Sequence, residues 1–251
     1  MDLQLDQRVY LVTGGSGGLG RATAEQLVAD GAKVLISGRS EEALQHAVSE
    51  LGPNAAFEVA DNADPASAER LVAATLARFG RLDGVLISVG GPPTGTPITN
   101  TDEQWQASFD SVFLGAVRIA RSAAAVLGEG GSITFVLSSS VKAPLEGLAI
   151  SNGFRPGLAM FAKDLARELG PRGIRVNGLL PGRVGTDRVL KIDDGAADPA
   201  AARAAVEATI PLRRYGNPDE FGRVAAFLMS PAASFVSGAM VPVDGGMLQA
   251  L

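Results

Sequence analysis

The sequence predicts an α/β fold: a doubly wound parallel sheet of about seven strands with helices on both faces. Short apolar runs alternate with amphipathic stretches almost to the end of the 251 residues. The runs are apolar throughout rather than at every second residue, which is typical of parallel strands covered on both faces. Because the crossovers between such strands are right-handed, the ligand crevice is expected outside the carboxyl ends of the strands.

The expected strands are short apolar runs that end in turns. They are Val9–Val12, Val34–Ser37, Ala56–Val59, Val85–Val89, Ile133–Leu137, Val176–Leu180 and Met240–Val243. Runs of this length between turn residues indicate buried strands rather than helices. Functional side chains are therefore expected just after the strands.

The expected helices carry apolar residues three or four positions apart, the spacing of one helical face. They contain Leu19, Thr23 and Leu27; Ala43, Leu44 and Val48; Leu71, Val72, Leu76 and Phe79; the stretch from about Asp102 to Val126; and Leu158, Phe161, Leu165 and Leu169. The last helix is expected to begin at Pro156, because a residue that precedes proline disfavours the α region. That start would place Arg155 on a loop.

The first strand leads into a glycine-rich turn, T-G-G-S-G-G-L-G, and then into the first helix. Free backbone N–H groups and the positive end of the helix dipole make such a turn an anion site. Gly14, Gly18 and Gly20 would let the backbone approach a pyrophosphate where a Cβ atom would collide with it. A tight turn in any α/β domain is the alternative interpretation, but the rest of the chain favours a dinucleotide and a Rossmann-like fold.

Composition excludes several other classes of function. The 27 acidic and 22 basic residues give a net charge of −5, which argues against nucleic acid and anionic membranes as partners. The chain has no cysteine, and no His or carboxylate cluster has metal-ligand spacing, so no metal site is expected. A polar N-terminus and the absence of a span-length apolar stretch predict a cytoplasmic protein.

Several motifs together resemble the short-chain dehydrogenase/reductases, and more narrowly their 3-oxoacyl-acyl-carrier-protein-reductase-like members. The glycine turn is similar to the family's T-G-x-x-x-G-x-G, and V-P-V-D-G-G is similar to its C-terminal strand and turn. The resemblance covers essentially the whole chain, so residues 1–251 are expected to form one domain. It implies hydride transfer between a nicotinamide cofactor and a small-molecule carbonyl or alcohol, and a homodimer or homotetramer.

The resemblance also assigns the cofactor to the glycine turn and to loops after later strands. The implied contacts are Gly14, Ser16, Gly18, Leu19, Gly20, Arg39, Asp61, Asn62, Gly90, Pro181, Gly182 and Thr186. Gly38 stands where NAD-preferring relatives carry an acid, and Arg39 follows it. Because a guanidinium forks onto a phosphate and Ser37 can add a hydroxyl, NADP(H) is expected rather than NAD(H).

The catalytic positions depart from the family's Asn-Ser-Tyr-Lys set. Ser138 falls on the serine position, with Ser139 and Ser140 as alternatives, whereas Ser151 and Arg155 fall on the tyrosine and lysine positions. Serine is a much weaker acid than a phenol, and arginine stays protonated. Arg155 is expected to bind ribose, or an oxyanion or carboxylate of a substrate.

Two further departures leave the activity open. Val112 occupies the asparagine position, and Ser88-Val89-Gly90-Gly91 replaces the family's N-N-A-G. Ser151, Asn152 or Lys142 would have to complete a proton path through water. A sensor or an inactive partner subunit that keeps only the cofactor pocket is the alternative hypothesis.

One stretch, Arg188 to Ile210, lacks a clear period and is rich in Ala, Asp and Gly. It predicts an irregular excursion, either a plain surface segment or, as its place directly after a strand favours, a mobile lid over the crevice. Its carboxylates Asp193, Asp194 and Asp198 are expected to keep the segment in solvent. The single histidine, His46, lies in a charged amphipathic stretch and is interpreted as a surface residue.

Overall fold

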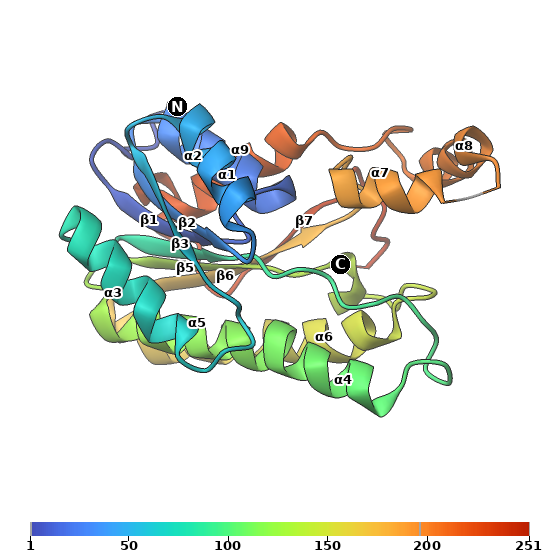
Figure 1. Ribbon diagram of the computed structural model, residues 1–251, viewed down its shortest axis with the longest axis horizontal. Coiled ribbons are helices and arrows are strands. Elements are labelled where there is room, and N and C mark those ends of the chain that lie inside the picture. The colour runs from blue at the N-terminus through green and yellow to red at the C-terminus, as the bar shows by residue number, and fades with distance from the viewer. Residues whose placement is uncertain (1, 196, 251) are drawn as a thin grey trace.

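A computed structural model describes residues 2–195 and 197–250, and their strands form one parallel sheet (Figure 1). The strands are β1 (Val9–Thr13), β2 (Lys33–Gly38), β3 (Ala55–Val59), β4 (Gly84–Ile87), β5 (Ser132–Val136), β6 (Arg175–Pro181) and β7 (Met240–Val243). Their order is β3-β2-β1-β4-β5-β6-β7, so the winding reverses between β1 and β4. The predicted doubly wound fold is confirmed.

Helices cover both faces of this sheet (Figure 1). One layer holds α1 (Gly18–Ala29), α2 (Glu41–Leu51) and α9 (Pro218–Met229), and the other holds α3 (Ser67–Phe79), α5 (Gly115–Val126) and α6 (Ala149–Leu169). Successive residues of a strand pack into the hydrophobic cores on opposite faces of the sheet. Tyr10 and Val12 pack against the layer of α1, α2 and α9, and Leu11 packs against the layer of α3, α5 and α6. This alternation explains why the strands must be apolar on both faces.

The stretch expected to be one long helix is continuous but not uniform. It begins as α4 (Asp102–Ser108), whose N-cap Thr101 forms a capping box with Gln104, and it ends as α5. Between them, Phe109–Leu114 form a π-helical segment. π-Helical turns often lie at functional sites, and this one places Val112 in the wall of the cavity described below.

The expected start of α6 at Pro156 is wrong. The helix begins at Ala149, and Pro156 lies inside it. Contacts outside the helix hold its first turns, because the Asn152 side chain bonds both ways to the Leu145 backbone, at 3.0 and 2.8 Å. Arg155 is therefore helical rather than on a loop, one turn after Ser151 and on the same helix face.

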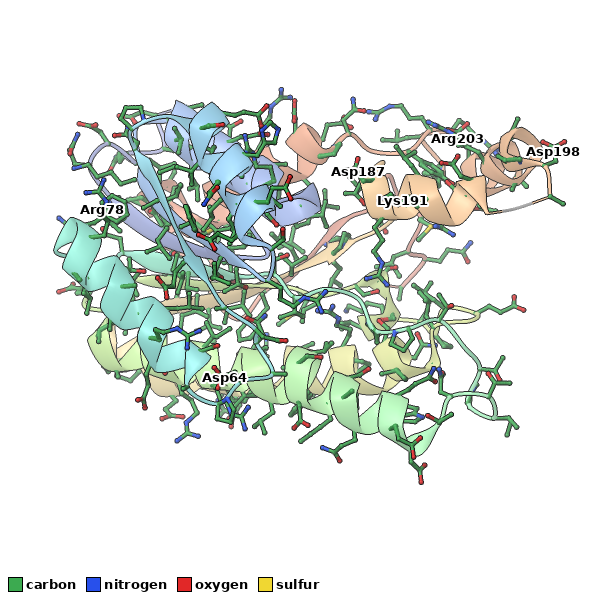
Figure 2. All side chains as sticks on the ribbon, in the orientation of Figure 1. Asp64, Arg78, Asp187, Lys191, Asp198 and Arg203 are labelled. Atoms are coloured by element: carbon green, nitrogen blue, oxygen red, sulfur yellow. The ribbon has the colours of Figure 1, made fainter. Side chains whose placement is uncertain are left out.

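The stretch from 188 to 210 is helical for most of its described residues, so the expectation of an irregular excursion is also wrong. It contains α7 (Asp187–Asp194) and α8 (Pro199–Thr209), which extend beyond the end of the sheet (Figure 1). Figure 2 shows Lys191 and Arg203 on these two helices. Asp198 caps α8 by accepting a hydrogen bond from the Ala201 N–H at 3.0 Å, and Asp193 is buried 3.9 Å from Arg183.

β4 ends two residues earlier than expected, so Ser88 and Val89 lie in the loop after it. The other strands agree with their expected bounds to within one residue at each end. This difference matters for the site, because the carbonyls of the loop are then free to accept hydrogen bonds from side chains.

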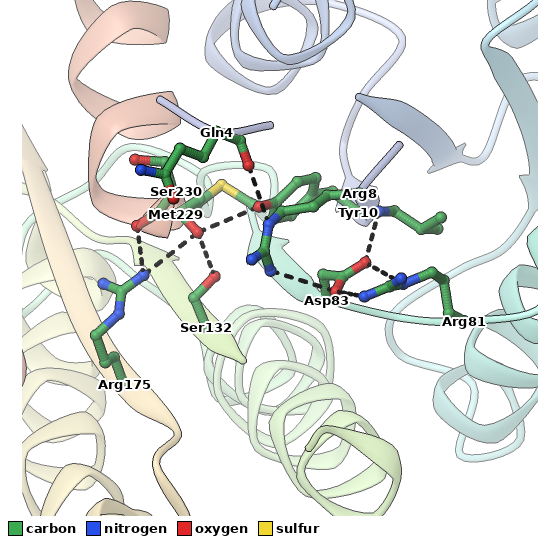
Figure 3. A network of polar contacts seen from close by, with 10 residues as sticks. Gln4, Arg8, Tyr10, Arg81, Asp83, Ser132, Arg175, Met229 and Ser230 are labelled. Atoms are coloured by element: carbon green, nitrogen blue, oxygen red, sulfur yellow. Dashed lines mark hydrogen bonds and ion pairs between the residues drawn. The ribbon is translucent and has the colours of Figure 1, made fainter. Parts of the chain in front are cut away.

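A polar network closes the opposite end of the sheet, where the strands begin (Figure 3). The Asp83 carboxylate accepts a hydrogen bond from the Val9 N–H at 2.8 Å and two from Arg81. Tyr10 donates to the Met229 carbonyl at 3.4 Å, and burial raises the pKa of its phenol well above the usual value. Tyr10 is therefore a structural residue, remote from the carboxyl ends of the strands.

Candidate active site

The turn between β1 and α1 is shaped by glycines that no other residue could replace without strain. Gly14 and Gly18 have φ values of +61° and +55°, the left-handed region that favours glycine. A Cβ atom on Gly14 would lie 2.7 Å from the Ser88 carbonyl oxygen, and one on Gly20 would overlap the Gly14 carbonyl. Gly14 and Gly20 thus pack the turn closely against its neighbours, and a side chain at either position would displace it.

The start of α1 has the properties of an anion site. Its N-cap residue, Gly17, offers no side-chain cap, and its first turn holds no acidic residue. The first N–H groups of a helix have no partner within the helix, and here no side-chain cap is supplied. These donors, together with the helix dipole, can bind a phosphate.

A cavity of about 390 Å³ runs along the carboxyl ends of β1, β2, β3 and β4. Six of the predicted cofactor contacts line it, namely Gly14, Ser16, Arg39, Asp61, Asn62 and Gly90. A Cβ atom on Gly38 would come within 3.3 Å of the Ser16 hydroxyl oxygen, so a larger residue at position 38 would crowd this end of the cavity. The exposed Arg39 stands at its rim.

The other predicted cofactor contacts lie outside the walls of this cavity. Leu19 packs against the core, and Gly182 lies so close to Asp244 that a Cβ atom there would come within 2.7 Å of it. Thr186 lies over the glycine turn, with its methyl 3.5 Å from a Cβ atom built on Gly18. The segment that follows Pro181 at the end of β6 therefore reaches back over the start of α1.

Serine hydroxyls gather where β5 and α6 meet. The Ser138 hydroxyl accepts a hydrogen bond from the Ser140 N–H at 3.1 Å, and the Ser140 and Ser151 hydroxyl oxygens lie 3.5 Å apart. Ser140 and Ser151 are buried, whereas Ser138 is half-buried. Of the two alternatives considered for the serine position, Ser140 is the one bonded to Ser151.

Arg155 lies beside these hydroxyls with only 5% of its surface exposed. Its Nη1 donates to the Val136 carbonyl at 2.7 Å and its Nη2 to the Val89 carbonyl at 3.5 Å, while its Nε has no partner. Burial, and then the nearby Arg188, lower the pKa of the guanidinium to about 10. Arg155 therefore remains a cation at neutral pH.

Arg188 is a residue that sequence reasoning missed. It projects from α7 onto the loop after β4, where it donates to the Gly91 carbonyl at 2.9 Å and to the Pro92 carbonyl at 3.1 Å. Its guanidinium lies against Gly91, since a Cβ atom there would overlap it. Its place two residues after Thr186, in the segment expected to cover the crevice, was the only signal for it.

Two groups considered for a proton path lie elsewhere. The Asn152 amide is held by the Leu145 backbone, and Lys142 is exposed on the loop that leads into α6. Val112 is buried in the cavity wall. Of the predicted catalytic residues, Ser138 and Ser151 are linked through Ser140, and Arg155 lies one helical turn after Ser151.

The fold and the glycine turn define a dinucleotide-binding protein, and comparison with known proteins gives its family. The family model for enoyl-(acyl carrier protein) reductase matches residues 14–248. The chain belongs to this family of the short-chain dehydrogenase/reductases, which confirms the resemblance seen in the sequence.

Individual relatives align over nearly their whole lengths. Levodione reductase of Leifsonia aquatica is 36% identical, covering 95% of this chain and 93% of the relative. The 3-oxoacyl-(acyl-carrier-protein) reductase of Salmonella typhimurium is 30% identical, covering 98% and 99%. The crystal structure of L-sorbose reductase from Gluconobacter frateurii, complexed with NADPH and L-sorbose, superposes with a TM-score of 0.93 at 30% identity, covering all of both chains.

The described part of the chain shows neither a metal-ligand cluster nor a membrane-spanning helix. Residues 2–195 and 197–250 contain no group of three or more His, Asp or Glu side chains that could hold a metal ion. Among the same residues, no helix combines the length and apolar character that crossing a membrane requires.

Proposed function

We propose that this protein is an NADP(H)-dependent oxidoreductase that reduces a small carbonyl compound, or oxidises the alcohol, at an active site rebuilt around serine and arginine. The observation that carries the proposal is the cavity at the carboxyl ends of the strands, where the glycine turn and the Gly38-Arg39 pair suit a phosphorylated dinucleotide. Ser138, Ser151 and Arg155, which the sequence resemblance assigns to the family's catalytic positions, lie near the end of β5 and the start of α6.

The residues of the crevice fit the proposed cofactor. A Cβ atom would fill the space at Gly14 and Gly20, so the tight turn that presents the α1 N–H groups depends on them. Arg39 and Ser16 flank Gly38, so a phosphate there would meet a cation and a hydroxyl, and position 38 itself carries no acid. NADPH in the L-sorbose reductase structure supports the same choice of cofactor. When bound, reduced nicotinamide supplies a hydride, and the carbonyl oxygen takes a proton to become the alcohol.

The protein's own residues position the substrate and deliver that proton. The half-buried Ser138 hydroxyl would donate to the substrate oxygen, and the Ser140–Ser151 pair would pass a proton on through water. Serine does not ionise near neutral pH, so this path is a weak substitute for a phenol. A positioned acid or base contributes roughly 10²–10⁴-fold to a rate. Holding the hydride donor and acceptor in a reactive orientation contributes effective molarities of about 10⁵–10⁸ M. Slow hydride transfer at this site is thus physically reasonable.

A second function rests on the same replacements. Arg155 donates to two backbone carbonyls, so it links the loop after β4 to the end of β5 as a structural residue would. A cofactor-binding sensor or an inactive partner subunit would need the glycine turn and nothing from Ser138 or Ser151.

Cofactor titration and single-turnover kinetics separate the two functions. NADPH and NADH are titrated by the change in their fluorescence, and bound NADPH is then mixed with a panel of ketones and 3-oxoacyl thioesters. We expect tighter binding of NADPH than of NADH, and substrate-dependent oxidation that slows in Ser138→Ala. Tighter NADH binding would contradict the cofactor choice. If no substrate consumes NADPH, the sensor is favoured.

We also propose that the chain is one domain with a lid formed by α7 and α8, and that it assembles as a homodimer or homotetramer. An aromatic cluster lies at the surface of α4 and α6, where the rings of Trp105 and Phe154 pack edge to face at 5.3 Å. Met160 of α6 is 70% exposed. An apolar face of this kind is typical of subunit contacts. Light scattering that gives the monomer mass at micromolar concentration would contradict it.

A further inference from the structure

Two arginine side chains meet at the loop after β4, and the hydrogen bonds that they make to residues 2–195 and 197–250 all go to backbone carbonyls. Arg155 donates to Val89 in this loop, and Arg188 donates to Gly91 and Pro92 two and three residues further on. Among residues 2–195 and 197–250, none of the ion pairs includes either arginine. The two cations are close enough for Arg188 to lower the pKa of Arg155.

Other arginines of the same region do have acidic partners. Arg203 on α8 pairs with Glu207 at 2.9 Å, and Arg183 lies 3.9 Å from Asp193. Arg155 is more deeply buried than either, yet its Nε has no partner and its two carbonyl acceptors carry no net charge. A buried charge without a counter-charge is costly, and its retention points to a ligand that supplies one.

The phosphates of the proposed cofactor have other binding groups. The pyrophosphate is expected on the N–H groups of the β1–α1 turn, and a 2′-phosphate on Arg39 at the rim of the cavity. Arg155 instead belongs to the substrate end, because it lies one helical turn from Ser151, which contacts Ser140. An anion at this place therefore belongs to the substrate.

We propose that Arg155 and Arg188 together bind a carboxylate of the substrate, so that the protein acts on short oxo or hydroxy acids. The inference rests on the proposed function and names its substrate class. Guanidinium groups bind carboxylates through paired N–H donors, and Arg155 has an unused donor in its buried Nε. Arg188 is exposed and would exchange two neutral carbonyl acceptors for the charged one. The substrate's carbonyl would then face the Ser138 hydroxyl.

A matched pair of probes tests the charge directly. Acetoacetate and methyl acetoacetate share the same reducible ketone, but only the first carries a carboxylate. The variant is Arg188→Gln, which leaves the buried Arg155 in place and changes an exposed side chain. The control is Arg203→Gln, which removes one cation from the same lid without touching the loop after β4.

We expect the wild-type protein and the Arg203→Gln variant to prefer acetoacetate, with a lower KM than for the ester. In Arg188→Gln, KM for acetoacetate should rise about 10- to 100-fold, as expected from the loss of hydrogen bonds to a charged group. KM for the ester and the Kd for NADPH should stay within about twofold. A second readout needs no turnover: acetoacetate added with NADP⁺, which cannot reduce it, should raise the Tm, and Arg188→Gln should abolish that rise.

Two results would overturn this assignment. Equal use of the acid and the ester would show that no carboxylate is recognised while leaving the proposed oxidoreductase intact. A loss of NADPH affinity in Arg188→Gln as large as the loss of acetoacetate affinity would assign the arginines to the cofactor's pyrophosphate. Conversely, a Tm rise with acetoacetate that Arg188→Gln abolishes, without oxidation of NADPH by either probe, would support the carboxylate site and contradict the oxidoreductase.

Discussion

Substituting Gly14 by alanine tests whether the conformation of the β1–α1 turn is needed to bind the phosphates of the cofactor. Gly14 has φ +61°, and an alanine in this region costs about 1–2 kcal/mol. Its Cβ atom would also lie 2.7 Å from the Ser88 carbonyl oxygen, where ordinary contacts are longer than 3.4 Å. Relieving such overpacking costs about 1–3 kcal/mol. We therefore expect the free energy of unfolding to fall by about 2–5 kcal/mol.

A matched control separates the backbone cost from the contact. Gly80 caps α3 with φ +78° and ψ −6°, and a Cβ atom there meets nothing within 4 Å. Gly80→Ala should lose only the backbone cost, about 1–2 kcal/mol, and should bind NADPH normally. Urea unfolding followed by circular dichroism measures the first quantity, and NADPH fluorescence titration measures the second.

The two variants should differ in cofactor binding as well as in stability. The collision at Gly14 displaces either the turn or the loop after β4, so the Kd for NADPH should rise at least about tenfold, a change of about 1.4 kcal/mol. Equal losses of stability in Gly14→Ala and Gly80→Ala, with unchanged NADPH affinity in both, would contradict the phosphate-binding role of the β1–α1 turn.

Three further predictions concern other parts of the molecule. Arg39→Ala should raise the Kd for NADPH about tenfold, because it removes a charge-assisted hydrogen bond at an exposed site, and should leave NADH binding unchanged in parallel titrations. Ser138→Ala should slow single-turnover NADPH oxidation about 10²-fold or more without changing cofactor affinity, whereas a merely structural serine would leave the rate intact. Arg214 hydrogen-bonds both oxygens of Glu220 at 2.7 Å and lowers the pKa of this carboxyl to about 2. Because the pKa is lower in the folded state than in the unfolded one, Glu220 stabilises the fold above about pH 4.5 and progressively less down to about pH 2. The Tm difference between wild type and Glu220→Gln, measured across this range, should therefore shrink as pH falls, and a difference that grows would contradict the ion pair.

The sheet could be predicted well because its signals are local. A strand buried on both faces must be apolar throughout, so β1 and β2 are visible in the sequence as Val9–Val12 and Val34–Ser37 without knowledge of their neighbours. The glycine turn is visible for the same reason, since a positive φ at Gly14 is a property of one residue's backbone. Repeated β-α alternation then leaves few topologies.

The errors arose where distant contacts override local preference. The residue before Pro156 should avoid the α region, yet α6 passes through it because the bonds from Asn152 to Leu145 anchor the preceding turn. The stretch around Asp198 looked irregular, although this aspartate caps a helix. Neither the Asn152–Leu145 bonds nor the Asp198 cap can be recognised from the residue pattern of a short stretch of sequence.

The sequence by itself determined the fold class and the glycine-rich turn, because each depends on residue identity at positions along the chain. Only the tertiary structure decided which groups meet in the crevice. Arg155 and Arg188 are 33 positions apart in the sequence and on different helices. They meet only because α6 and the segment after β6 both reach the loop that follows β4, and that proximity makes two ordinary arginines a site for an anion.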